Sequence, residues 1–315
     1  MVDLAPPSLP EQPAPAPGAG DGPLGPEPGR AARPPRRRRP RRRTTTTYVF
    51  RFVTIAYLVM LVAWPVSLVA KETFADGFTT LRTAFDDPEV TSALRLTVVV
   101  ALSAVVINTV FGLGISLLLV RYRFPGRRLL SALIDVPLSV SPVVVGLALT
   151  LVYGGRNGWF GPALEDAGFQ VIFATPGIIL ATVFVALPLV IREVVPVLEE
   201  IGVEQEQAAR SLGANAVQTF RRITLPAIKW AVVYGVVLSL ARSLGEFGAV
   251  KVVAGNVGGK TRTATLAVEH KYQQFGADNL AAAYAISFLL AAVAVICIIV
   301  VSLLRPDLDR KEDPR

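Results

Sequence analysis

The sequence predicts an all-α membrane protein with six transmembrane helices, and its composition and hydropathy support this prediction. Of the 315 residues, 52% are hydrophobic and 18% are charged, and the mean hydropathy is +0.50. A soluble domain carries about a quarter charged residues, so a wholly soluble or disordered chain is excluded. Charge-free stretches recur that are long enough to cross about 30 Å of hydrocarbon as helices. The single cysteine, Cys297, excludes a disulfide scaffold, and a lone Cys and His form no zinc site.

Residues 1–47 form a Pro- and Arg-rich arm that we expect to be disordered and cytoplasmic. It holds Arg36–Arg39 and Arg41–Arg43 but too little apolar surface to offset the entropy of folding. A basic run also suits nucleic acid, but no aromatic residues interleave it and a hydrophobic stretch follows at once. We therefore favour an anchor attracted to anionic membrane lipid, without nucleic acid as a partner. The membrane domain then covers residues 48–305, and a cytoplasmic tail covers residues 306–315.

The six predicted spans differ in whether charged residues interrupt them. Four contain no charge, namely Phe52–Ala70, Leu96–Val120, Ala167–Ile191 and Asn279–Leu304. Two are interrupted, Leu129–Tyr153 by Asp135 and Trp230–Val250 by Arg242 and Glu246.

Loop charge predicts the orientation of these spans. The loop between the second and third spans is crowded with cations, Arg121, Arg123, Arg127 and Arg128, which places it in the cytoplasm. The basic arm then lies on the same side. Six crossings return the chain to that side, so both termini are expected to be cytoplasmic in a multi-pass protein of the inner or plasma membrane.

The loop of residues 192–229 is too long and too patterned to be a plain connector. Ala208, Ala209 and Leu212 share one helical face, and Gly213 suits the left-handed residue that ends a helix. The stretch just upstream is acidic. Ala208, Ala209 and Leu212 thus form a small apolar knob with an acidic rim. The alternative for an amphipathic helix is to lie on lipid, but anionic lipid would repel this rim, so we favour docking into another protein.

A second short helix is expected directly after this glycine. Asn215 is a candidate N-cap, and Gln218 is spaced as its capping-box partner. The apolar face of this helix consists of Val217, Phe220 and Ile223. We expect Leu225–Pro226 to end it, because a residue before proline is disfavoured in helical conformation.

The segment EQEQAARSLGANAVQTFRRITLPAI resembles the EAA loop of ABC-importer membrane subunits: Glu-Ala-Ala, three residues, Gly, nine residues, then Ile-x-Leu-Pro. The matching positions are Ala208, Ala209, Gly213, Ile223, Leu225 and Pro226. Gln207 stands where the family usually has Glu, and Glu206 precedes it. The resemblance implies that this loop, with Leu212, is a coupling helix seated in a cleft of a separate ATPase subunit.

The segments FPGRRLLSALIDVPLSVSPVVVGLALTLVYG and YGVVLSLARSLGEFGAVKVVAG are similar to sulfate/thiosulfate permease subunits of the CysW type. The resemblance implies a type I ABC-importer permease of the MetI-like fold. It also implies an ATP-binding subunit, a second permease subunit of the CysT type and an extracytoplasmic sulfate-binding protein as partners. A molybdate or tungstate permease is the alternative within this class, and a secondary anion transporter or a tethered interaction protein is the alternative outside it.

The chain is expected to have no catalytic or metal site of its own. Gly258-Gly259-Lys260-Thr261 is similar to part of a P-loop, but Ala254 stands where that motif requires glycine and no strand precedes it. The resemblance implies that ATP and magnesium bind to the partner ATPase, so this subunit is a transporter component and no enzyme.

Charged and polar residues inside the spans are the candidates for the transport path. Arg242 and Glu246 are four residues apart on the predicted fifth helix, where they either neutralise each other or line the path near a gate. Gly245 and Gly248 beside them permit close helix approach or local bending.

The third span contributes weaker candidates. Ser139 and Ser141, next to prolines, would offer hydroxyls to a passing oxyanion, and interrupted helices expose N–H groups that suit anions. For Asp135 we favour pairing with the preceding arginine cluster, Arg127 and Arg128, over a role in the path. His270 stands alone on a predicted outer loop, which argues against a metal or catalytic role.

Overall fold

The computed structural model describes residues 45–304 of the chain. Most of the predicted arm, residues 1–44, and the predicted tail, residues 306–315, lie outside the described residues. The chain divides into two units, residues 1–52 and 53–315, and the packing below concerns the second unit.

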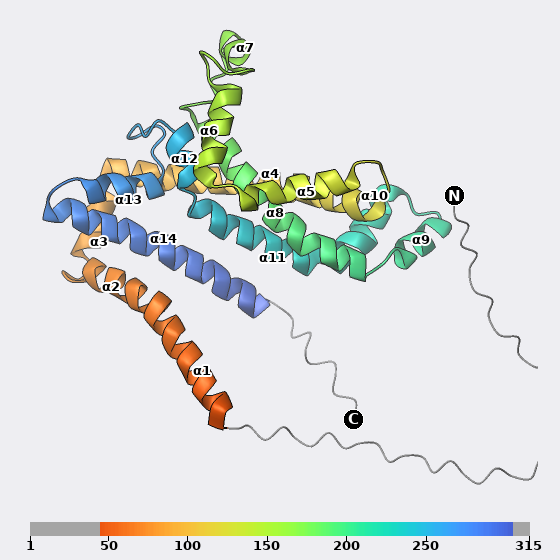
Figure 1. The fold of residues 1–315 in the computed structure, drawn as a ribbon, viewed down its shortest axis with the longest axis horizontal. Coiled ribbons are helices and arrows are strands. Elements are labelled where there is room, and N and C mark those ends of the chain that lie inside the picture. The colour runs from red at the N-terminus through yellow and green to blue at the C-terminus, as the bar shows by residue number, and fades with distance from the viewer. Residues whose placement is uncertain (1–44, 305–315) are drawn as a thin grey trace, which may run out of the picture. The chain divides into compact units, whose positions relative to one another are not determined.

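Every regular element among the described residues is helical (Figure 1). In chain order they are α1 (Thr45–Leu58), η1 (Val59–Ala63, a π-helical turn), α2 (Trp64–Thr73), α3 (Thr79–Asp86), α4 (Pro88–Arg121), α5 (Arg127–Ser139), α6 (Pro142–Tyr153), α7 (Gly161–Asp166), α8 (Thr175–Glu200), α9 (Glu204–Ser211), α10 (Ala216–Thr219), η2 (Phe220–Thr224, a second π-helical turn), α11 (Leu225–Leu244), α12 (Gly248–Val253), α13 (Ala264–Gln273) and α14 (Ala277–Leu304).

The number of spans agrees with the sequence prediction. Within residues 45–304, five helices are long and apolar enough to cross a membrane, and the α5–α6 pair makes a sixth if it counts as one broken span. The pair is bent by 114° where α5 ends at Ser139 and α6 begins at Pro142. Pro142 has no N–H and disfavours helix at the residue before it, so the break falls at the second proline of this region.

Helices α4, α8 and α11 pack against one another and form the centre of the described bundle. Val190 of α8 lies between Gly112 of α4 and Gly235 of α11. A Cβ atom at either glycine would lie 3.0 Å from Val190, a contact tighter than most real Cβ contacts, so glycine favours the close approach of these backbones. Further along, Val194 and Leu198 of α8 pack with Ile228 of α11.

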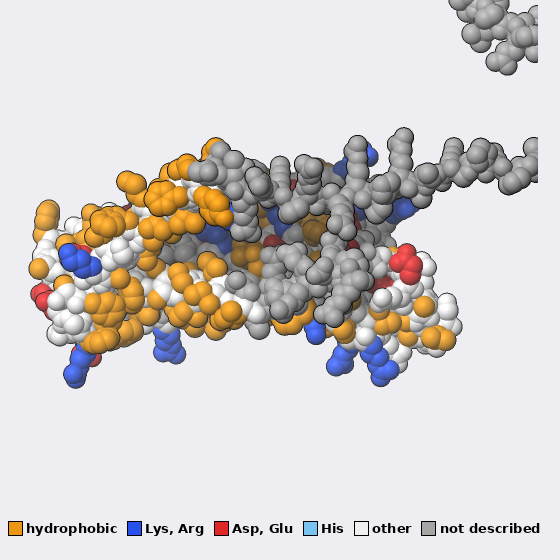
Figure 2. Space-filling model, turned by 90° about the horizontal axis from the view of Figure 1, so that it is seen from below, with side chains coloured by type: hydrophobic (Ala, Val, Ile, Leu, Met, Phe, Trp, Pro, Cys, Tyr) orange, Lys and Arg blue, Asp and Glu red, His pale blue; other side chains and the backbone are white. Residues whose placement is uncertain are grey.

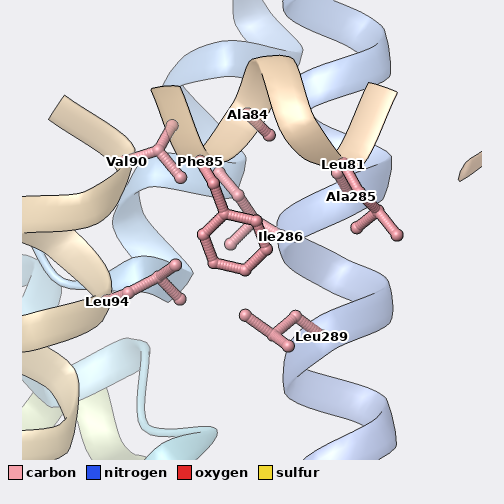
Figure 3. Close-up of a pocket in the computed structure, with 8 residues that line it drawn as sticks. All are labelled: Leu81, Ala84, Phe85, Val90, Leu94, Ala285, Ile286 and Leu289. Atoms are coloured by element: carbon pink, nitrogen blue, oxygen red, sulfur yellow. The ribbon is translucent and has the colours of Figure 1, made fainter. Parts of the chain in front are cut away.

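A second packed region joins shorter helices to this centre. Val100 of α4, Val145 of α6, Ile178 of α8, Val250 of α12 and Leu266 of α13 belong to one buried cluster. Helix α14 lies beside α2, α11 and α13 (Figure 1). Phe85 of α3 points toward α14 in a small apolar pocket, whose walls are drawn in Figure 3 and consist of Leu81, Ala84, Phe85, Val90, Leu94, Ala285, Ile286 and Leu289.

Large apolar side chains are exposed over much of the helical surface. All residues from Val53 to Leu68 are exposed, as are Val106, Val110 and Phe111 on α4. Figure 2 shows such side chains lying next to one another on one face. Apolar patches of this extent mark surfaces in contact with lipid or protein, as the composition predicted.

Three predicted boundaries are wrong. The span Ala167–Ile191 begins too early, because helix α8 runs from Thr175 to Glu200. Past Ile191 the charged end of this helix forms ion pairs, between Arg192 and Asp135 and between Glu199 and Arg127. The span Trp230–Val250 is also displaced, since one helical stretch covers Ala216–Leu244 and then breaks.

The third wrong boundary is the expected helix end at Leu225–Pro226. Leu225 is helical, with φ −63° and ψ −44°, and the helix continues from η2 into α11. The N–H of Leu225 bonds to the carbonyl oxygen of Phe220, five residues back. This wider π-helical turn directly precedes Pro226, which lies in the first turn of α11, where the missing N–H of proline is tolerated.

The contact between α6 and α12 predicts a strong size limit at Gly146. A Cβ atom there would lie 2.8 Å from the Ala249 carbonyl oxygen, so Gly146→Val should overpack this contact and destabilise the protein by about 1–3 kcal/mol. Thermal unfolding of the purified protein in detergent measures the effect. Gly114→Ala on α4, where a Cβ meets no atom within 4 Å, is the matched control and should not lower stability. Equal unfolding temperatures for Gly146→Val and the wild type would contradict this packing.

Candidate functional site

The predicted knob is a helix–Gly–helix unit made of α9, Gly213 and α10. Gly213 has φ +88°, and the N–H of Ala214 bonds to the carbonyl oxygen of Ala209, which confirms the predicted left-handed helix end. Asn215 caps α10, and the capping box with Gln218 is present in both directions at 2.9 and 3.0 Å. The local sequence therefore determines this turn.

The unit exposes apolar side chains to its surroundings. Leu212 is 89% exposed and Val217 is 64% exposed, while Ala209 is half-buried. Gln207, Ala208 and Pro226 are also exposed, and Ile223 and Leu225 are half-buried. A projecting leucine of this exposure, on a rigid turn, has the form of a docking feature.

Glu206 differs from the other predicted knob residues, because it points into the protein. Its Oε1 atom lies 3.0 Å from Nη2 of Arg121 and accepts hydrogen bonds from Arg121 Nε at 3.1 Å and Thr224 Oγ1 at 2.9 Å. Arg121 is the last residue of α4, and its Nη1 donates to the carbonyl oxygen of Leu198 at 3.1 Å. Sequence reasoning used Arg121 only for loop charge and missed this contact.

Arg242 and Glu246 form an ion pair, but not along one helix as predicted. Helix α11 ends at Leu244, and Glu246 lies in the break before α12. The two side chains are 2.9 Å apart, with Arg242 39% exposed and Glu246 2% exposed. Glu246 is fixed further by the N–H of Ala249, which donates to Oε1, and by Thr265 Oγ1, which donates to its backbone oxygen. The Glu246 carboxylate therefore lies next to the first residues of α12, and the Arg242 guanidinium is the more exposed member of the ion pair.

A buried polar group that the sequence analysis missed lies on the same face of α11. Ser239, Arg242 and Ser243 of α11 follow the i, i+3, i+4 spacing of one helical face. Asn108 of α4 is fully buried and donates to Ser239 Oγ at 3.4 Å. Within residues 45–304, Asn108 Oδ1 and Ser243 Oγ have no hydrogen-bond partner. Asn108 was detectable as the one amide side chain in the predicted span Leu96–Val120.

The remaining predicted path residues are placed at two helix breaks. Ser139 ends α5 and Ser141 is the N-cap residue of α6, both exposed. Gly245 follows the end of α11, and Gly248 begins α12, where a Cβ atom would lie 3.0 Å from Pro142 of α6. The Gly248 contact brings the two breaks together, as close approach at this glycine had suggested.

Asp135 does not pair with the preceding arginine cluster. Its carboxylate accepts two hydrogen bonds from Arg192 of α8, at 2.9 and 3.1 Å. Arg127 pairs instead with Glu199. The structural role of Asp135 is therefore to tie α5 to α8.

The Asp87 end of α4 carries a separate set of ion pairs. Arg262, in the segment before α13, is buried and pairs with Glu89, and it also donates to Asn256. Lys271 of α13 lies 2.8 Å from Asp87. Burial raises the pKa of the Asp87 carboxyl, but the hydrogen bond and charge of Lys271 and the backbone N–H of Glu89 lower it on balance below its usual value of 3.8. These contacts hold the segment before α13 and α13 itself against α4.

The comparisons with known proteins agree with this architecture. Residues 109–310 match the family described as binding-protein-dependent transport system inner membrane component, and the chain belongs to this family. It is therefore an inner-membrane permease component.

Two sulfate permeases are among its relatives. The chain is 45% identical over 252 residues to the sulfate transport system permease protein CysW of Synechococcus elongatus, covering 80% of this chain and 87% of that protein. It is 43% identical over 206 residues to the corresponding CysT protein of Salmonella typhimurium, covering 65% and 73%.

A solved structure confirms the fold class. The bacterial alginate ABC transporter, crystallised with an alginate pentasaccharide-bound periplasmic protein, matches with a TM-score of 0.67 at 16% identity. The match covers 86% of this chain and 96% of that one. The predicted all-α ABC-importer permease fold is thereby confirmed.

The lowered pKa of Asp87 predicts a pH dependence of stability. With a folded-state pKa below the unfolded value, the contribution of the carboxylate is present above about pH 3.9 and lost as pH falls through the folded pKa. Asp87→Asn, which retains a capping side chain, should unfold at lower temperature than the wild type at neutral pH. The difference should vanish as the pH falls below the folded-state pKa of Asp87. Asp86→Asn, at the exposed neighbouring carboxyl, is the control; a pH-independent difference for Asp87→Asn would refute the prediction.

Proposed function

We propose that this chain is the permease subunit of an ATP-driven importer for sulfate and thiosulfate. The observation that carries the proposal is a projecting helix–Gly–helix unit in a chain that belongs to the inner-membrane component family and shares 45% identity with a sulfate permease. The subunit itself binds no ATP, and the energy comes from an ATP-binding partner.

The coupling surface is the face of the α9–Gly213–α10 unit that carries Leu212 and Val217. Their exposure of 89% and 64% supports docking of this unit into a cleft of the ATPase. With Gly213 fixed at φ +88° and Asn215 in a capping box, the unit is stiff enough to move as one body. Closure of the ATPases would then displace the helices attached to it.

The transport path contains Arg242. A guanidinium that is 39% exposed, beside a carboxylate that is nearly inaccessible, gives an oxyanion a positive site within the spans. Ser139 and Ser141 at the α5–α6 break are the weaker candidates along this path. The pore needs only to discriminate charge and size, because a delivery protein selects the anion.

The assembly contains a second permease subunit of the CysT type, an ATPase pair and an extracytoplasmic sulfate-binding protein. Relatives of both permease types and the alginate transporter with its periplasmic protein support this composition. Both termini and the α9–Gly213–α10 unit face the cytoplasm, as the Arg-rich loop between α4 and α5 favours.

Substitution at Gly213 tests the coupling role. Gly213→Val should abolish ATP-driven sulfate uptake in reconstituted vesicles, because a β-branched residue at φ +88° is strained even though the space there is free. Gly213→Asn should retain most of the uptake, since Asn tolerates the left-handed conformation. Wild-type uptake in Gly213→Val would contradict the docking of this unit.

Substitution at Arg242 tests the path. Arg242→Ala should lower sulfate uptake by about tenfold or more, which corresponds to the loss of about 1.4 kcal/mol of attraction. Arg242→Lys retains the charge and should retain more uptake. The double variant Arg242→Ala, Glu246→Gln removes the unpaired carboxylate and should remain impaired. Unchanged uptake in both variants that lack Arg242 would refute its role in the path. Competition by molybdate in the wild type would instead indicate molybdate as the substrate.

A further inference from the structure

We propose that Arg121 and Glu206 form a clamp that makes the coupling unit move together with α4. The α4–α9 clamp consists of the Arg121 guanidinium, the Glu206 carboxylate, the Thr224 hydroxyl and the carbonyl oxygen of Leu198. This inference rests on the proposed function, because it assigns how motion of the docked unit reaches the membrane helices.

The clamp joins the end of α4 to three segments that follow one another much later in the sequence. Arg121 ends α4, Leu198 lies in the last turns of α8, Glu206 is on α9 and Thr224 ends η2. Arg121 and Glu206 are 85 residues apart along the chain, yet their side chains meet at 3.0 Å. The clamp therefore gives α9 a connection beyond its packing on its sequence neighbours α10 and η2.

Burial makes this ion pair a fixed contact. Both side chains are only 10% exposed, in contrast to the Arg127–Glu199 pair nearby, whose side chains are 43% and 57% exposed at 3.7 Å. An exposed pair exchanges readily with water, whereas a buried charge that loses its partner is costly. The clamp should therefore remain closed while the unit is displaced.

The geometry favours arginine over lysine. Nε and Nη2 face the carboxylate of Glu206, while Nη1 donates to Leu198 on another helix. A planar guanidinium reaches both acceptors at once, but the single ammonium of lysine does not. Thr224 Oγ1 adds a third group on the same carboxylate oxygen, at 2.9 Å.

Helix α4 carries the motion toward the path. From the clamp it runs unbroken to Pro88, and it holds Asn108 against Ser239 of α11 on the way. Displacement of α9 would thus shift the helix that contacts Ser239 on α11. Glu206 is, in this assignment, a positioning residue inside the subunit, while the exposed Gln207 and Leu212 face the ATPase.

The test compares ATP hydrolysis with sulfate uptake in vesicles that contain the complete transporter. Arg121→Ala and Glu206→Gln should retain hydrolysis within about twofold of the wild type and lose about tenfold in uptake per ATP. Arg121→Lys should be intermediate, and the exchange Arg121→Glu, Glu206→Arg should recover part of the coupling. Arg127→Ala, at the exposed pair, is the matched control and should leave both rates unchanged.

A second measurement needs no partner subunit. In the purified chain, Arg121→Ala should accelerate amide hydrogen exchange in residues 204–219, and Arg127→Ala should not. Unchanged exchange, an unchanged ratio of uptake to hydrolysis, or loss of both rates because the ATPase no longer associates would each overturn the clamp. If the wild-type complex shows no ATP-driven uptake, the proposed function fails, and the exchange measurement still decides whether the clamp holds α9 to α4.

Discussion

Close approach of three helix backbones around Val190 is the constraint on which the other features of this protein depend. Lipid is as apolar as the helices, so association within it relies on tight packing. Gly112 of α4 and Gly235 of α11 allow Val190 of α8 to come within 3.0 Å of where their Cβ atoms would be. This contact determines how each of the three helices is rotated about its own axis and how far it is shifted along that axis relative to the others.

The polar contacts follow from that arrangement. With α4 and α8 in register, Arg121 at the end of one lies within 3.1 Å of the Leu198 carbonyl of the other, and the same guanidinium meets Glu206. With α4 and α11 in register, Asn108 faces Ser239. Removing one partner of a buried ion pair costs about 3–5 kcal/mol, so such pairs are stable only where packing determines their positions.

The sequence predicts features that depend on a few neighbouring residues. The left-handed Gly213 and the Asn215–Gln218 capping box were predictable because each depends on local backbone geometry. The number of spans was predictable from charge-free length. The partners of Asp135 and Arg121 were not, because ion pairs between distant segments depend on the tertiary packing of α4, α5 and α8. The continuation of the helix through Pro226 was not predicted either, because it depends on a π-helical turn at residues 220–224 that directly precedes the proline.

Arg242 and Glu246 form an ion pair in which the arginine side chain is the more exposed partner, so the positive charge is more accessible than the negative one. An arginine alone in a span is costly, and a fully buried ion pair would be neutral toward an anion. Here the carboxylate is 2% exposed and bonded to the N–H of Ala249, where it meets the positive end of α12, while the arginine is 39% exposed. The helix start shares the attraction of Glu246, so part of the field of Arg242 remains directed to its open side. The break between α11 and α12 frees the N–H of Ala249 for this carboxylate, because in a continuous helix that N–H would bond to a backbone carbonyl oxygen.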